Sequence, residues 1–177
     1  MFRILSKLIQ KYRIYKADSA NVGALFSEIY GFKLGKNSRF TGKNISFGSE
    51  PFLIEIGDDV TITPGVKFQT HDGGVALFRK EHIGMNVFGK IKIGNNVFIG
   101  EDSMIMYGVT IGNNVVIGAR SLVTKDIPDN CVAAGTPSRI IKTLEEYKIS
   151  SLKKSIQIFE KDIELRKKEI ISKLHSR

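Results

Sequence analysis

A strict period of six runs through the middle of the chain and limits what it can fold into. Every sixth residue is β-branched and aliphatic: Val87, Ile93, Ile99, Ile105, Ile111, Ile117 and Val123. A second set with the same period is small or aliphatic: Ile91, Val97, Ser103, Val109, Val115 and Ser121. A helix repeats near 3.6 residues and a single strand near 2, so neither produces a six. The period therefore predicts an all-β solenoid of parallel coils, with three six-residue units in each coil and the aliphatic residues pointing inward.

Breaks in this period divide the chain. The pattern begins weakly at Leu34 and is clear from Ile56 to Phe68, but nineteen residues then separate Phe68 from Val87, which is not a multiple of six. We therefore predict a solenoid over residues 34–142 with a loop extruded over 69–86. Long loops on a rigid scaffold are usual places for function. The remaining parts are a helical segment over 1–33 and a charged helix over 143–177.

Turn residues and helix signals refine this outline. The corners Gly94-Asn95-Asn96 and Gly112-Asn113-Asn114 suit tight turns, because Gly and Asn tolerate positive φ at low cost. Residues 2–16 form an amphipathic pattern with an apolar stripe, which predicts a helix packed against the solenoid or a neighbouring subunit. An interfacial membrane anchor is the alternative. Ser19 is the expected N-cap of a second helix over 19–31.

The net charge of +9 is concentrated in the two ends of the chain. Residues 1–16 carry five basic residues and no acidic ones, and residues 150–177 carry eight basic and four acidic ones. The middle, 17–149, is balanced with 14 of each sign. A nucleic-acid protein needs a basic patch on its folded face, so nucleic acid is not expected as a partner. Weak contact between the basic N-terminal helix and a membrane surface is compatible with the charge, and an acidic glycan is the other partner that the charge allows.

Cysteine usage and hydropathy bear on the compartment. The single cysteine, Cys131, excludes an internal disulfide and suits a reducing cytoplasm. No run of 18 apolar residues is present, and charges interrupt the N-terminal apolar residues, unlike in a signal peptide. We expect a cytoplasmic protein, with the inner face of the membrane as the place of any peripheral contact.

Candidate chemistry gathers at the two interruptions of the period. His71 stands at the root of the loop, where an imidazole can take a proton from a hydroxyl. Lys125, Arg139 and Lys142 follow the last repeats and could pair with phosphate groups. Cys131 is interpreted as a small buried thiol rather than an acyl carrier.

Three stretches together resemble the left-handed β-helix (hexapeptide-repeat) acyltransferases. They are the repeats, the loop sequence Phe68-Gln-Thr-His-Asp-Gly-Gly-Val-Ala-Leu-Phe-Arg79, and the ending from Gly118 to Lys142. Within that family the chain looks like the maltose, galactoside and polysaccharide O-acetyltransferases, and the segment from Ser49 to Gly57 followed by that loop sequence is especially like members found in surface-polysaccharide biosynthesis. The resemblance implies a left-handed coil, a homotrimer with active sites between adjacent solenoids, and acetyl-CoA as co-substrate with no metal.

The same resemblance implies roles for individual residues. His71 would be the general base that deprotonates a sugar hydroxyl. Ala119, Thr124, Lys125 and Arg139 would contact coenzyme A. Asp72 or Glu50 would orient the imidazole, and the sequence does not choose between them.

Other functions stay open as alternatives. The main rivals are a sugar N-acetyltransferase and a serine acetyltransferase. A γ-carbonic anhydrase-like hydratase needs three histidine ligands around zinc, whereas His82 is the only other histidine near His71. The last alternative is a non-catalytic scaffold, against which His71, Lys125 and Arg139 argue.

Overall fold

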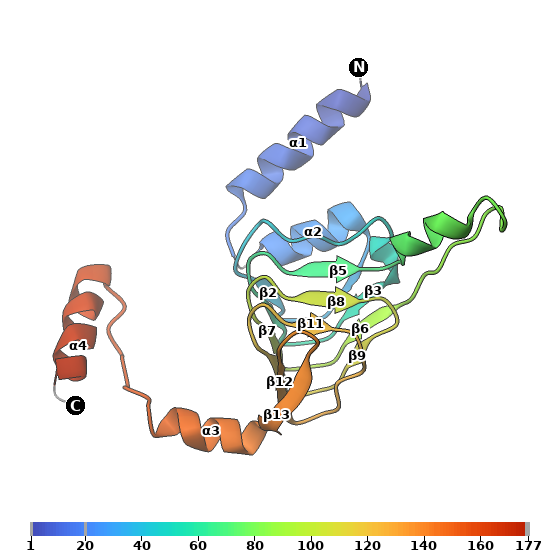
Figure 1. The fold of residues 1–177 in the computed structure, drawn as a ribbon. Coiled ribbons are helices and arrows are strands. Elements are labelled where there is room, and N and C mark those ends of the chain that lie inside the picture. Colours follow the sequence, from blue (N-terminus) through green and yellow to red (C-terminus); the bar gives the residue numbers. More distant parts are fainter. Residues whose placement is uncertain (1, 20, 176–177) are drawn as a thin grey trace. The chain divides into compact units, whose positions relative to one another are not determined.

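The computed structural model describes residues 2–19 and 21–175, with the side chains of residues 2–7 outside the described part (Figure 1). The chain divides into two compact units, Met1–Leu144 and Glu145–Arg177. The first unit holds the strands and the second holds most of the charged C-terminal segment. Each is described by itself.

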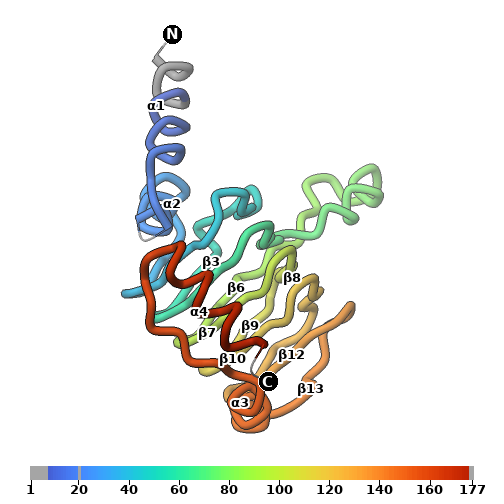
Figure 2. Tube along the Cα trace, turned by 90° about the vertical axis from the view of Figure 1, so that its left-hand side faces the viewer, coloured from blue at the N-terminus to red at the C-terminus, as the bar shows by residue number. Residues whose placement is uncertain are grey.

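The strands of the described residues form three sheets, which the chain visits in turn. Sheet A is parallel and contains β1 (Lys33–Leu34), β3 (Ile54–Ile56), β6 (Ile91–Ile93) and β9 (Thr110–Ile111). Sheet B has the parallel strands β2 (Arg39–Phe40), β4 (Thr61–Ile62), β7 (Val97–Ile99), β10 (Val115–Ile117) and β12 (Cys131–Ala134), and ends in the antiparallel β13 (Arg139–Thr143). Sheet C is parallel and contains β5 (Lys67–Gln69), β8 (Met104–Met106) and β11 (Leu122–Val123). Successive circuits of the chain are therefore stacked (Figure 2).

Strand register shows how long each circuit is. Val115 pairs with Val97, so one circuit of the regular region contains three six-residue units, as predicted. The other circuits differ. The circuit that joins Arg39 to its partner Thr61 is longer, and the one that joins Val116 to its partner Val132 is shorter. Extra residues in the corners of the early circuit explain why the six-residue pattern is weak before Ile56.

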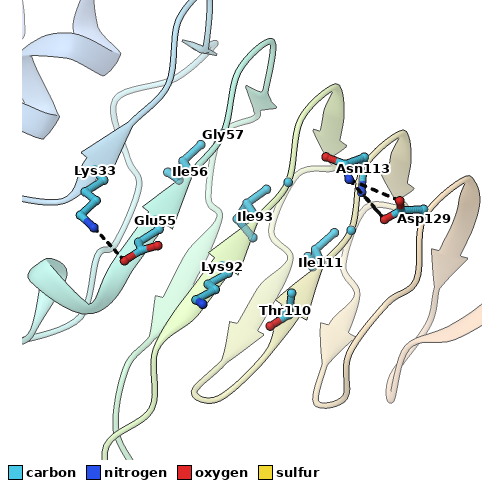
Figure 3. A pocket seen from close by; sticks show the side chains of 12 residues that line it. Lys33, Glu55, Ile56, Gly57, Lys92, Ile93, Thr110, Ile111, Asn113 and Asp129 are labelled. Atoms are coloured by element: carbon cyan, nitrogen blue, oxygen red, sulfur yellow. Dashed lines mark hydrogen bonds and ion pairs between the residues drawn. The ribbon is translucent and has the colours of Figure 1, made fainter.

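The predicted inward column forms the core, with one exception. From Ile93 to Val123 its six members are at most 4% exposed, and Ile56, Ile62 and Phe68 continue the column one circuit earlier. Figure 3 shows Ile56, Ile93 and Ile111 on successive strands of sheet A. Fully burying each such side chain contributes about 1.5–3 kcal/mol. Placing Val87 in this column was wrong, because Val87 is only half-buried and lies on the returning leg of the loop.

The corners between sheets A and B are built by stacked asparagines. Asn96, Asn114 and Asn130 all have φ between 53° and 60°, as the corner sequences predict. The Asn96 side-chain amide donates to Oδ1 of Asn114 at 2.8 Å, and the Asn114 amide donates to Oδ1 of Asn130 at 2.9 Å. Each corner thereby satisfies polar groups of its neighbour, so the circuits are joined at their edges as well as through the sheets.

The N-terminal segment forms two helices. Helix α1 spans Phe2–Lys16 and α2 spans Val22–Tyr30. Phe26 on α2 packs on Phe40 and Phe47, which closes the core at this end. The expected cap at Ser19 was wrong, because α2 starts at Val22 and the Asp18 carboxylate accepts the bond from the Asn21 N–H.

The C-terminal segment is two helices rather than the single one expected over 143–177. Helix α3 spans Leu144–Leu152 and α4 spans Ile163–His175. Between them the Asp162 carboxylate accepts bonds from the N–H groups of Glu164 and Leu165, each at 3.0 Å. This side-chain cap starts a new helix instead of continuing the first. Among the described residues, none of the helices has the length and apolar character needed to cross a membrane.

Candidate active site

The loop between sheets C and A is closed at its base by backbone hydrogen bonds. Strand β5 ends at Gln69 and β6 begins at Ile91, so the returning leg extends past residue 86 (Figure 1). The N–H of Gly89 donates to the carbonyl of Thr70 at 3.0 Å, and the N–H of Asp72 donates to the carbonyl of Val87 at 2.9 Å. Between them His71 forms an antiparallel bridge with Phe88. We call these six residues, 70–72 and 87–89, the loop base.

His71 is held by a carboxylate from the preceding circuit. Its Nδ1 lies 2.9 Å from Oε2 of Glu50, and the Phe88 ring stands edge-on with its centroid 6.2 Å from that of the imidazole. An ionised carboxylate only accepts hydrogen bonds, so this contact assigns the proton to Nδ1 and leaves the Nε2 lone pair available. The side chain of His71 is 29% exposed and that of Glu50 19%. The arrangement can therefore accept a proton from a group that approaches Nε2.

Glu50 is held in turn by a buried hydroxyl. Thr70, which is fully buried, donates from Oγ1 to Oε2 of Glu50 at 2.7 Å. This hydrogen bond is the main cause that lowers the pKa of Glu50 below its ordinary value of 4.5; burial opposes it, and the bond and charge of His71 add to it. Gly48, with φ of 66°, leaves room for the hydroxyl, since a Cβ there would lie 2.7 Å from Thr70 Oγ1. Glu50 is thus kept ionised beside His71.

Asp72, the other residue expected to orient the imidazole, makes different contacts. Its Oδ1 accepts from the Gly74 N–H at 2.8 Å, which caps the 3₁₀ helix Gly73–Phe78. Its Oδ2 accepts from the Tyr107 hydroxyl at 3.1 Å, and this bond and the charge of Asp72 raise the pKa of Tyr107. Glu50, and not Asp72, therefore contacts the imidazole.

The predicted coenzyme contacts lie around sheet C and the final hairpin. Lys125 and Arg139 line one surface depression together with Asp126, Ile127, Ser138 and Ile140. Ala119 and Thr124 are exposed in the turns before and after β11. His71 and Lys125 each follow the end of a sheet C strand by two residues, and β5 and β11 flank β8, so about 10 Å separates their strands. The C-terminal ends of the sheet C strands thus carry both His71 and Lys125, and Arg139 of β13 shares the depression with Lys125.

The other candidates take no part in this arrangement. Cys131 is buried as predicted, its Sγ lies 3.2 Å from the Pro128 carbonyl, and burial raises its thiol pKa. His82 is exposed in the loop. A groove over sheet A, with the Lys33–Glu55 ion pair at one end and Asp129 at the other, contains none of the predicted site residues (Figure 3). Within residues 2–19 and 21–175, His, Cys, Asp and Glu form no cluster of three that could hold a metal ion.

Sequence reasoning missed Thr70 and Tyr107. A register signal existed for Glu50, because Ser46 pairs with Lys67, and Glu50 precedes His71 by the same separation along the chain. Nothing comparable marks Tyr107, whose partner Asp72 is far away in sequence, across the inserted loop.

Comparisons with known proteins agree with this architecture. The family model described as bacterial transferase hexapeptide (six repeats) matches residues 90–125. Protein CapG of Staphylococcus aureus is 57% identical over 123 residues, which cover 69% of this chain and 72% of that protein. The chain belongs to the hexapeptide-repeat acyltransferase family. The resemblance noted from the sequence is thereby confirmed.

Two solved structures extend the comparison. A hexapeptide-repeat acetyltransferase from Vibrio cholerae, complexed with acetyl coenzyme A, has a TM-score of 0.58 and 32% identity, covering 77% of this chain and 84% of that one. A galactoside acetyltransferase in complex with coenzyme A has a TM-score of 0.57 and 31% identity, covering 90% of this chain and 86% of that one. Both of these similar structures are thus acetyltransferases that bind coenzyme A or its acetyl ester.

Proposed function

We propose that this enzyme transfers an acetyl group from acetyl-CoA to a sugar hydroxyl, with His71 as the general base. The observation that carries the proposal is the contact of His71 Nδ1 with Glu50 at 2.9 Å, which leaves Nε2 as a proton acceptor at the base of the loop. The complexes of similar acetyltransferases with coenzyme A and acetyl-CoA support the choice of donor. The galactoside acetyltransferase supports a sugar as acceptor.

The reaction needs one proton transfer and one acyl transfer. His71 Nε2 takes the hydroxyl proton as the oxygen attacks the thioester carbonyl, and the carbon–sulfur bond then breaks. The imidazolium formed on the way is stabilised by Glu50, whose carboxylate is ionised. The proton on His71 can leave with the thiolate as free coenzyme A thiol, so the enzyme ends the cycle unchanged.

The proposed binding site of the acetyl donor lies at the C-terminal ends of the sheet C strands, beside β13. Lys125 and Arg139 line one depression and supply cations for the phosphates of coenzyme A, with Ala119 and Thr124 as neighbouring contacts. The assembly proposed is a homotrimer of left-handed coils, with the site between adjacent copies. The half-exposed Phe88 beside His71 and the 68% exposed Phe52 support it, because a neighbouring copy would cover them.

The acceptor proposed is a surface polysaccharide or its precursor, on the resemblance carried by the segments from Ser49 to Gly57 and from Phe68 to Arg79. Thiol release from acetyl-CoA, measured across oligosaccharides, amino-sugars and serine, tests this choice. Preference for an amino-sugar or for serine would replace it with one of the alternatives.

The role of His71 is tested by His71→Ala. The variant should keep its oligomeric state by light scattering and lose at least about a hundredfold in acetyl transfer. His82→Ala is the matched control, because this histidine is exposed in the same loop, and it should keep normal turnover. A folded His71→Ala variant with near wild-type turnover would refute the assignment.

A further inference from the structure

An exposed apolar stripe runs along helix α1. Leu8, Tyr12 and Tyr15 follow each other at spacings of four and three, so they share one face of the helix. They are 58%, 62% and 75% exposed, and the adjacent Ile9 is 53% exposed. Such a contiguous apolar face on an exposed helix marks an interaction surface.

Contacts near its C-terminal end attach α1 to the rest of the first unit and leave most of this stripe open. Ile14 is partly buried against the core, and Arg13 donates both terminal guanidinium nitrogens to the Glu28 carboxylate at 2.9 and 2.8 Å. The Lys43 ammonium binds the carbonyl of Tyr15 at 2.6 Å and lies 5.8 Å from the centroid of its ring. The helix is therefore held near its end while Leu8 and Tyr12 face solvent.

The charged residues of α1 itself are all basic. Residues 1–16 contain five basic residues and no acidic one, whereas residues 17–149 are balanced. Lys11 lies one helical turn from both Leu8 and Tyr15, on one flank of the stripe, and Lys16 lies one turn from Tyr12 at its C-terminal end, so two exposed cations stand beside the apolar side chains. Lysines can bury their stems beside apolar groups while the ammonium stays at the polar boundary.

We propose that the stripe Leu8, Ile9, Tyr12 and Tyr15 docks on an anionic lipid bilayer, with Lys11 and Lys16 against the acidic headgroups. Tyrosine suits the boundary between headgroups and acyl chains, because its ring is apolar and its hydroxyl is polar. The 15-residue helix is about 22 Å long and lies in the plane of the surface. A nucleic acid would match the charge but would leave the apolar stripe without a partner.

A single reporter can test this surface directly. The chain has no tryptophan, so Tyr12→Trp in the full-length protein places the only indole on the stripe. With vesicles of phosphatidylcholine and phosphatidylglycerol, its emission should shift to the blue and its quenching by acrylamide should fall. Vesicles of phosphatidylcholine alone, or high salt, should weaken both effects. Leu77→Trp, which is exposed in the 3₁₀ helix of the loop, is the matched reporter and should not respond.

Charge variants in the Tyr12→Trp background measure the electrostatic contribution to vesicle binding. Replacing Lys11 and Lys16 by Gln should reduce partitioning onto anionic vesicles about 25-fold, since each cation near the surface contributes about fivefold. The matched pair, Lys36→Gln with Lys90→Gln, removes two cations from the coils and should leave partitioning unchanged.

Three results would overturn the proposal. One is the absence of a vesicle response in a folded Tyr12→Trp protein. Another is a blue shift that depends on protein concentration without vesicles, which would show that a second copy covers the stripe. The third is a response of Leu77→Trp in place of Tyr12→Trp, which would assign membrane contact to the loop. All three readouts are independent of acetyl transfer, so they do not test His71.

Discussion

Replacing Thr70 by Val isolates the hydroxyl that holds Glu50. The two side chains have nearly the same shape, and Thr70 is fully buried, so the main change is the loss of the 2.7 Å bond to Oε2. A hydrogen bond to a charged group contributes about 1.5–3 kcal/mol, and the free energy of unfolding at neutral pH should fall by about 2 kcal/mol. For a chain of this length, the corresponding drop in Tm is about 4–8 °C.

The pH dependence gives this prediction its sign. The folded pKa of Glu50 lies below the ordinary 4.5, so the ionised carboxylate stabilises the fold above that pH, and the stability is lost as pH falls through the lowered pKa. Without the Thr70 hydroxyl the pKa of Glu50 rises. The Tm deficit of the valine variant should therefore be largest near neutral pH and shrink in acid, where both proteins carry a protonated Glu50.

Thermal unfolding of Thr70→Val and Thr70→Ser across this pH range is the assay. The serine variant keeps the hydroxyl and loses a buried methyl, so it should lose about 1 kcal/mol at every pH. In the pH profile of kcat, the loss of activity on the acidic side should begin at higher pH in the valine variant, because the pKa of Glu50 rises. At neutral pH its kcat should fall about tenfold if the orientation of His71 contributes about 1.4 kcal/mol. Equal and pH-independent Tm losses in the two variants would refute the reasoning.

Three further substitutions probe the candidate site, and a fourth serves as a control. Glu50→Gln removes the charge beside His71, and kcat should fall by at least about tenfold while the oligomeric state by light scattering is unchanged; normal kcat would exclude a positioning role. Arg139→Ala should raise the KM for acetyl-CoA more than the KM for the acceptor, and the opposite order in initial-rate kinetics would count against a phosphate contact. Gly48→Ala combines a positive φ with a Cβ 2.7 Å from Thr70 Oγ1, so Tm and kcat should both fall, whereas Gly73→Ala, with no atom within 4 Å of its Cβ, should change Tm little.

The regular part of the fold could be predicted because packing repeats along the chain. Each inward position from Ile93 to Val123 faces the same environment one circuit later, so the same residue type recurs and the period is visible. Val87 precedes Ile93 by six residues, but this spacing is a coincidence. Its backbone carbonyl accepts a hydrogen bond from Asp72 at the loop base, and backbone bonds of this kind impose no periodic pattern on the sequence.

The candidate site could be proposed from the sequence because it interrupts the pattern. His71 stands where the period breaks, and Lys125 and Arg139 stand where it ends. Which carboxylate contacts His71, Glu50 or Asp72, depends on the length of the circuit that contains His71. This circuit is longer than the regular ones, so the six-residue period does not predict which residues lie beside His71. Thr70 was invisible because one buried hydroxyl in a strand-like stretch is indistinguishable from packing.

The loop base also separates two kinds of variation. Its backbone bonds join Thr70 to Gly89 and Asp72 to Val87, while the coils on either side keep their own register through Phe68 and Ile91. Residues added to or removed from the segment 73–86 should therefore change neither the coil register nor the contact of His71 with Glu50. We therefore expect the length and sequence of this segment to vary between relatives while the loop base is retained.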